Sequence, residues 1–153
     1  MATVAAAVEN LRREILCQQR DDRALAEEVV KMRRRMREHL LPKEQQQTFH
    51  LKQGTGGIVD IEFTVQYAVL AWSHQQPELA RWPDNMRILE TLQATGLFTP
   101  QRAGGLGDAY LAFRGASHQL DLQQRPGEVA AADYADHRAL VRQVWQDLFG
   151  GVD

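Results

Sequence analysis

The sequence predicts an all-α fold, an up-and-down bundle of about six helices with at most one short strand, near Phe49–Lys52. Apolar side chains recur at steps of three and four residues along most of the chain, which is the period of an amphipathic helix. Capping residues or prolines precede these runs, and glycines or prolines follow them. The composition, 44% hydrophobic and 25% charged over 153 residues, is that of an ordinary globular domain. We therefore expect residues 1–153 to form a single helical domain.

The N-terminal part of the chain predicts a helical hairpin. A first helix should end before residues 18–22, and its apolar stripe consists of Val4, Val8, Leu11 and Ile15. Asp21 or Asp22 can cap a second helix, which Pro42 ends. The stripe of this second helix consists of Leu25, Val29, Met32, Met36 and Leu40. We expect both stripes to pack inside the protein.

The second predicted helix also carries a basic cluster, five cations within seven residues: Lys31, Arg33, Arg34, Arg35 and Arg37. Three interpretations are open. The cluster is a solvated helix face paired with the nearby Glu27, Glu28 and Glu38, a contact with a neighbouring domain or its nucleotide, or a nucleic-acid surface. No aromatic side chains are interleaved for base stacking and the net charge is −2, and both observations argue against nucleic acid as a partner.

The middle of the chain begins with a polar linker at residues 42–48 and a short alternating segment, Phe49–Lys52, typical of a strand. Such an edge strand would complete a sheet of a domain outside this sequence. Three glycines follow: Gly54, Gly56 and Gly57. Because glycine can take a positive φ, the N–H groups of this loop could approach a phosphate or another domain, with Lys52 as an adjacent cation.

The segment after the glycines, residues 58–72, has two interpretations. As a strand, it would place Asp60 and Glu62 on one face, as a divalent-metal site requires. As a helix, it would begin at Gly56 and Gly57 and direct the two acids about 200° apart. The apolar run continues to Trp72 with helical spacing, and its length suits a helix better than a strand.

Four further features are predicted towards the C-terminus. Pro77 and Pro83 bracket a short helical turn, and Asp84 can cap a helix that stops at Gly96. Thr99 and Pro100 open a long helix. Glycines inside a helix lower its stability, and we expect close approach of a neighbouring helix to compensate for this cost at Gly104, Gly105, Gly107 and Gly115. Asp133 is expected to start the last helix, which Gly150 and Gly151 end.

Several classes of site are excluded by residue type. The single cysteine, Cys17, allows neither an internal disulfide nor a zinc site of several cysteines. The five histidines are scattered, without the i, i+4 pair of a helical zinc site. No serine lies in a Gly-x-Ser-x-Gly turn. No apolar run is long enough to cross a bilayer and no signal pattern begins the chain, so we expect a soluble, cytoplasmic protein.

Three motifs in this order carry a resemblance to a known family: KQGTGGIVDIEFTVQY, RWPDNMRILE and AYLAFRGASHQLDLQ. From roughly Arg12 to Phe149 the chain resembles the C-terminal end of glutamine synthetase adenylyltransferase, the bifunctional glutamate-ammonia-ligase adenylyltransferase. The resemblance implies a helical domain that follows a nucleotidyltransferase domain, whose hallmark is a Gly-Ser turn and a D-x-D strand. This chain contains neither. We therefore expect a fragment that is inactive alone, with its catalytic core upstream.

The resemblance implies a role in nitrogen assimilation, auxiliary to adenylylation and deadenylylation of glutamine synthetase. It implies Mg²⁺ and ATP in the full enzyme, with none bound to the fragment and no metal site within it. The implied partners are glutamine synthetase, a PII-type signal protein and the upstream catalytic domain, without a membrane. The alternative is a non-catalytic interaction module that binds glutamine synthetase or the PII-type protein.

The site residues implied by the resemblance lie in its motifs. Asp60 and Glu62 are the candidate catalytic acids, with Asp60 expected to face the catalytic domain and Glu62 to point towards the bundle or solvent. The candidates for contact with a nucleotide, a phosphate or a domain interface are Lys52, Gly56, Gly57, Arg87 and Arg114.

Overall fold

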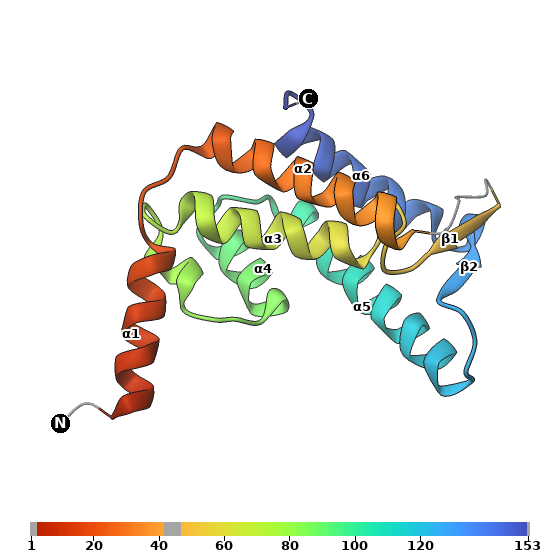
Figure 1. Cartoon of the computed structure of the whole chain (residues 1–153), viewed down its shortest axis with the longest axis horizontal. Helices are drawn as coiled ribbons and strands as arrows, with labels where there is room; N and C mark the ends of the chain where they lie inside the picture. The colour runs from red at the N-terminus through yellow and green to blue at the C-terminus, as the bar shows by residue number, and fades with distance from the viewer. Residues whose placement is uncertain (1–2, 42–46, 153) are drawn as a thin grey trace.

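The computed structural model describes residues 3–41 and 47–152, and residues 42–46 of the linker predicted at 42–48 lie outside these ranges. In them, the chain forms six α-helices, two short 3₁₀ helices, η1 and η2, and a small two-stranded sheet that lies at one end of the molecule (Figure 1). The elements are α1 (Val4–Leu16), α2 (Asp22–Leu40), β1 (Thr48–His50), α3 (Ile58–Trp72), η1 (Pro77–Ala80), α4 (Asn85–Ala94), α5 (Pro100–Leu122), β2 (Glu128–Ala130), η2 (Ala131–Tyr134) and α6 (Ala135–Phe149). The predicted helical fold is confirmed. No helix of the described ranges is long and apolar enough to cross a membrane.

Helix α3 is the centre of the bundle. It contacts α2 and α6 on one side and α4 and α5 on the other (Figure 1). Its buried side chains, among them Ile61, Val65 and Ala68, form the core together with residues of the surrounding helices. The helical interpretation of residues 58–72 is therefore correct, and Gly57 is the N-cap residue of α3.

The predicted helix starts are confirmed where a polar side chain caps the first turn. The side chains of Asp21, Asp84 and Thr99 accept hydrogen bonds from the backbone N–H groups of α2, α4 and α5, respectively. The prediction that Asp133 starts the last helix was wrong. Asp133 lies in η2, and α6 begins at Ala135. The reason is that β2 leads directly into η2, whose Tyr134 packs against Phe113 of α5.

The sheet differs from the prediction. β1 pairs in antiparallel register with β2, which the sequence did not predict, and Phe49 lies opposite Val129. Phe49 is fully buried and packs edge-on against Phe113, with 5.4 Å between the ring centroids. The segment therefore pairs within this chain, and its addition to a sheet of another domain stays a prediction. β2 has only three residues, too few to show alternating polar and apolar side chains. Its partner lies about 80 residues away in the sequence, so no hairpin turn marks the pair.

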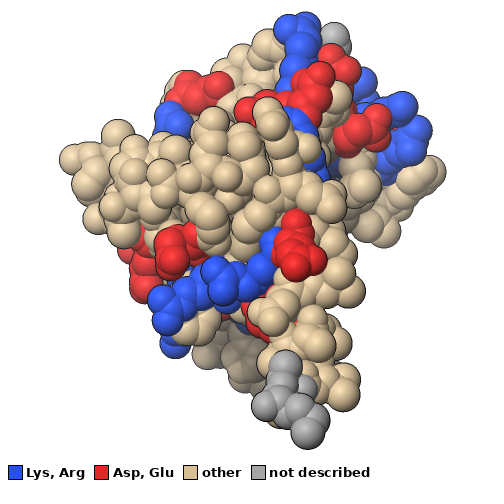
Figure 2. Space-filling view, turned by 90° about the vertical axis from the view of Figure 1, so that its left-hand side faces the viewer, with Lys and Arg blue, Asp and Glu red and all other residues tan. Residues whose placement is uncertain are grey.

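Helix α1 forms as predicted, but its apolar stripe does not pack inside the protein. The four stripe residues Val4, Val8, Leu11 and Ile15 are 47% to 83% exposed. The helix extends away from the bundle beside η1, where Arg12 donates to the Ala80 carbonyl at 2.5 Å (Figure 1). Figure 2 shows mainly tan atoms at the lower right of the molecule, with charged side chains of both signs above them and to their left. The predicted hairpin of α1 with α2 was wrong, because α2 packs its buried face against α3 and α6 instead.

The predicted stripe of α2 is buried only in part. The buried residues of the helix are Ala26, Val29 and Arg33, at steps of three and four. Met32 and Leu40, which the sequence placed inside, are more than half exposed. The buried face of α2 therefore differs from the predicted stripe. It includes Arg33, because this side chain binds Asp60 of α3.

We expect Leu11→Ala to change the free energy of unfolding by no more than about 0.5 kcal/mol, because this side chain is already largely in water. Leu92→Ala is the matched control. Leu92 is fully buried, and its truncation should cost about 2–5 kcal/mol. Urea denaturation of both variants measures the difference. Equal losses would mean that the α1 stripe is covered when the protein is in solution.

The glycines of α5 only partly serve close helix approach. A Cβ at Gly105 would clash with Leu140 of α6, and one at Gly107 would come within 3.2 Å of Met86. Gly104 and Gly115 have no such neighbour within 4 Å. The predicted compensation therefore applies to two of the four positions.

Candidate functional site

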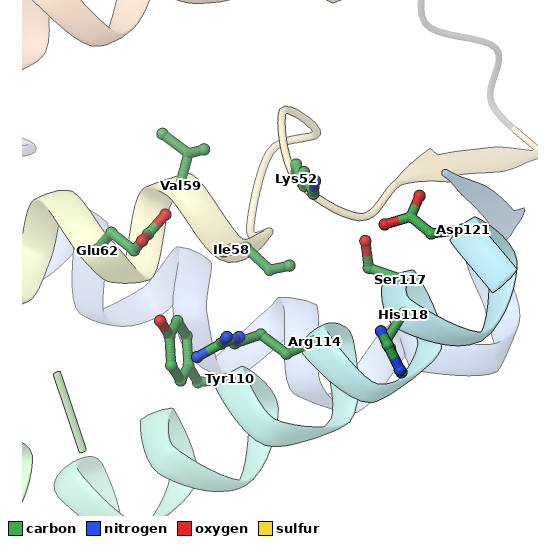
Figure 3. A pocket seen from close by; sticks show the side chains of 9 residues that line it. All are labelled: Lys52, Ile58, Val59, Glu62, Tyr110, Arg114, Ser117, His118 and Asp121. Carbon is green, nitrogen blue, oxygen red and sulfur yellow. The ribbon is translucent and has the colours of Figure 1, made fainter. Parts of the chain in front are cut away.

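A hollow of about 450 Å³ lies between the start of α3 and the C-terminal half of α5 (Figure 3). It is lined by Lys52, Ile58, Val59, Glu62, Tyr110, Arg114, Ser117, His118 and Asp121. The structure thus brings together three of the predicted site residues, Lys52, Glu62 and Arg114, from a loop and two helices. Sequence reasoning missed the other polar lining residues, which lie before and after Arg114 at helical spacing on the same face of α5: Tyr110, Ser117, His118 and Asp121.

Charges of both signs face this hollow. Partial burial raises the pKa of Glu62 above its ordinary value of 4.5, while the nearby cations Arg114 and Lys52 act in the opposite direction. The Arg114 guanidinium lies over the ring of Tyr110, 5.4 Å from its centroid. Figure 3 shows Glu62 and Arg114 on facing helices, with Lys52 approaching from the loop above. The two cations can bind an anionic group, with Glu62 beside it as a polar acceptor.

Asp60 does not face this hollow. Its carboxylate is 1% exposed and accepts from Arg33 Nε at 2.5 Å, from Arg37 Nη2 at 2.9 and 3.0 Å, and from the Gly56 N–H at 2.7 Å. The predicted divergence of the two acids on a helix is confirmed. Asp60 points into the bundle at α2, whereas Glu62 lines the hollow, and which of the two acids faces the catalytic domain stays a prediction.

The buried Arg33 clamps the glycine loop, residues 51–57 between β1 and α3, which carries Lys52. Besides Asp60, its guanidinium donates to the side-chain oxygen of Gln53 at 2.9 Å and to the Gln53 carbonyl at 2.7 Å. Arg138 of α6 donates to the Thr55 carbonyl at 3.0 and 3.1 Å. Two arginines from distant parts of the chain thus fix the loop, and with it the approach of Lys52 to the hollow.

The glycines allow the loop to make tight turns. Gly56 has a φ of +83°, a conformation that favours glycine. The Gly56 N–H donates to Asp60 and the Gly57 N–H donates to the Gly54 carbonyl at 2.9 Å. In this conformation neither N–H is free to bind a phosphate. A role of Gly56 and Gly57 at a domain interface stays a prediction.

The basic cluster of α2 is not simply a solvated face. Arg33 is fully buried and Arg37 half-buried, whereas Arg34 and Arg35 are exposed. Burial lowers the pKa of Arg33, and Asp60 partly offsets that effect. Sequence reasoning placed Arg33 among its charged neighbours. Its spacing of four from Val29 would have placed it on the buried face instead.

Arg87 lies outside the hollow. It is exposed on α4, and its guanidinium stacks over the ring of Trp82 at 4.3 Å from the centroid. Arg81 lies over the same ring, at 4.9 Å. The structure therefore separates Arg87 from Lys52, Glu62 and Arg114, and its predicted contact with a nucleotide or another domain stays untested.

Comparison with known proteins places the chain in a family. A family model described as GlnD PII-uridylyltransferase matches residues 30–131, more than half of the chain, and the chain belongs to this family. Among curated relatives, the bifunctional glutamine synthetase adenylyltransferase/adenylyl-removing enzymes of Pseudomonas putida and Nitrosococcus oceani are each 45% identical to it, over 95% and 96% of this chain. The same enzyme of Acinetobacter baylyi is 46% identical over 92%. The resemblance predicted from the three motifs is confirmed.

The chain corresponds to a small part of these relatives. It spans 16% of the length of the Pseudomonas putida and Acinetobacter baylyi enzymes and 15% of that of Nitrosococcus oceani. All three are named as adenylyltransferases, so the relatives of this helical domain are enzymes of the transferase class.

Proposed function

We propose that this chain is a helical domain of an enzyme that adenylylates and deadenylylates glutamine synthetase, and that its α3–α5 hollow faces the site of nucleotidyl transfer. The observation that carries this proposal is the convergence of Lys52, Glu62 and Arg114, from a loop and two helices, on one hollow. Lys52 and Arg114 would bind phosphate oxygens by charge-assisted hydrogen bonds. Glu62 would hold a proton or a polar group of the ligand beside them.

ATP and Mg²⁺ are the cofactors proposed for the longer enzyme. The hollow fits the phosphates of a nucleotide, since two cations line it. It does not supply a complete metal site, because the described residues contain no group of three or more metal-ligating side chains. The ligands of Mg²⁺, which neutralises phosphate charge when bound, would therefore come mainly from the rest of the enzyme.

In this proposal Asp60 is a positioning residue. It is sequestered from solvent by Arg33 and Arg37 and touches the glycine loop through the Gly56 N–H. It would act on the reaction through Lys52, whose loop it braces. Glu62 is the acid that can touch a ligand.

A second candidate function is an interaction module that binds glutamine synthetase or a PII-type signal protein. One observation favours it, the exposed apolar stripe of α1, which the described parts of the chain leave uncovered. In that case the α3–α5 hollow would contribute nothing to the rate of transfer.

The test uses the longer enzyme that contains this domain. We expect Lys52→Gln to lower the rate of AMP incorporation into glutamine synthetase about tenfold, the effect of one lost charge-assisted hydrogen bond. Lys31→Gln, an exposed position on α2, removes the same charge away from the hollow and should leave the rate unchanged. If Lys52→Gln also leaves it unchanged while the protein stays folded, the interaction module is the better account.

A further inference from the structure

Helix α1 presents an apolar face that the described residues do not cover. This face, the α1 stripe, has the i, i+4, i+7, i+11 spacing of a helix that inserts into an apolar groove: Val4, Val8, Leu11 and Ile15. Ala5 and Ala7 flank the stripe on its two sides and are exposed as well. The N-terminal half of α1 is therefore apolar over a surface wider than the stripe itself.

The structure holds this helix in one orientation. Arg20 donates to the carbonyl groups of Ile15 and Leu16, the last residues of α1, at 2.6 and 3.0 Å. The same guanidinium donates to the Leu70 carbonyl of α3 at 3.3 Å. Arg12 fixes the middle of α1 to a carbonyl group of η1. The stripe is thus positioned before a partner arrives, and a preorganised surface loses little conformational entropy on binding.

The stripe is too small to hold a separate molecule by itself. The exposed parts of its four side chains offer apolar surface on the order of 300 Å². A stable interface between two molecules buries about 800 Å² on each partner. A second copy of this chain, joined through α1 alone, would not reach that area. Two surfaces of one polypeptide need far less, because their effective concentration reaches the millimolar range.

The relatives contain the additional chain that such a partner requires. The matches to the enzymes of Pseudomonas putida and Nitrosococcus oceani cover 95% and 96% of this chain, so they include the greater part of α1. The chain accounts for only 16% and 15% of their length. In such enzymes, α1 therefore belongs to a polypeptide most of which lies outside the present sequence.

We propose that the α1 stripe docks into an apolar groove of the same polypeptide, in the part of the longer enzyme outside these 153 residues. This inference rests on the proposed function, and it assigns the stripe to an internal partner instead of glutamine synthetase or a PII-type protein. The groove would approach α1 most closely at its N-terminal half, where the flanking side chains are alanines. At the other half, the exposed Glu14 borders the stripe and would meet a polar rim.

Docking of α1 would also orient the rest of the bundle. Arg20 ties the end of α1 to α3, and the start of α3 lines the α3–α5 hollow. A groove that holds α1 would therefore set the position of the hollow relative to the part of the enzyme that contains the groove.

The experiment compares two single cysteines on α1, each combined with Cys17→Ser, in the 153-residue chain and in the longer enzyme. Val8→Cys reports on the stripe. Asn10→Cys is the matched control, because Asn10 is also exposed but leaves the helix about 200° away from Val8. The reaction with N-ethylmaleimide is followed on the α1 peptide by mass spectrometry. We expect Val8→Cys to react at least tenfold more slowly in the longer enzyme, and Asn10→Cys to react at similar rates in both proteins.

A second measurement needs no substitution. A helix of 13 residues with one face in water is marginally stable, so its amide hydrogens should exchange rapidly in the 153-residue chain. In the longer enzyme we expect the exchange of the α1 peptide to be at least tenfold slower.

Three outcomes would overturn the proposal. Equal labelling of Val8→Cys in both proteins would mean that no internal groove covers the stripe. Protection that appears only after glutamine synthetase is added would assign the stripe to that protein, and protection of the 153-residue chain that increases with its concentration would assign it to a second copy. None of these outcomes alters the effect expected for Lys52→Gln, so the proposed function is tested separately.

Discussion

Asp60→Ala should lower the free energy of unfolding by about 3–5 kcal/mol, one of the two largest effects expected in this protein. Arg33 is 0% exposed and its charge is neutralised by Asp60. Removing the carboxylate leaves that charge buried without a counter-ion and deprives the Gly56 N–H of its acceptor. The loss would be measured by urea denaturation followed by circular dichroism.

The control is a pair of the same residue types on the surface. Arg102 and Asp147 are also 2.5 Å apart, but their side chains are 29% and 38% exposed. Asp147→Ala should cost at most about 1 kcal/mol, because water replaces the lost partner. If both substitutions cost the same small amount, Arg33 is hydrated in solution and the buried clamp on the glycine loop does not exist.

A buried ion pair contributes little net stability, because both charges lose their hydration. A double variant therefore distinguishes the cost of an unpaired charge from the effect of the pair on the glycine loop. We expect the double variant Arg33→Met/Asp60→Ala to lose less than the sum of the two single losses, since no fully buried charge is left unpaired and Arg37, which also loses its partner, is 29% exposed. In the longer enzyme it would still lack the clamp on Gln53.

Gly57→Ala is the second substitution with a large expected effect, a loss of about 2–3 kcal/mol. A Cβ at this position would lie 2.5 Å from the Leu51 carbonyl oxygen and 2.9 Å from that of Gly54. Both neighbours are backbone atoms in a loop fixed by its own hydrogen bonds, such as that from the Ile58 N–H to the Leu51 carbonyl at 2.9 Å. The loop would have to shift as a whole, and Lys52 with it.

Gly104→Ala provides the matched comparison. Gly104 lies within α5 and is exposed, and a Cβ at this position would have no neighbouring atom within 4 Å. Alanine there should raise the free energy of unfolding by about 0.5–1 kcal/mol, because it restricts the unfolded chain and favours the helix. Thermal and urea denaturation of both variants measure these changes in the free energy of unfolding, which we expect to have opposite signs. A neutral Gly57→Ala would show that the loop tolerates a side chain and that its glycines are not required by close packing.

The sequence by itself determined the helices of this protein, because their signals are local. Asp84 and Thr99 cap the N–H groups of their own first turns, and the apolar spacing of α3 and α5 lies within single helices. The three motifs likewise predicted the family and three residues of the α3–α5 hollow, Lys52, Glu62 and Arg114.

Only the tertiary structure decided which side of α3 each acid faces and which cations it meets. The helical period gives the angle between Asp60 and Glu62, but no local signal says which of them points to α2. Arg33 lies 27 residues from Asp60, and their contact depends on how α2 packs across α3. The pairing of Phe49 with Val129 and the exposure of the α1 stripe were likewise decided by distant partners, since burial is a property of the assembled fold and not of the periodicity that precedes it.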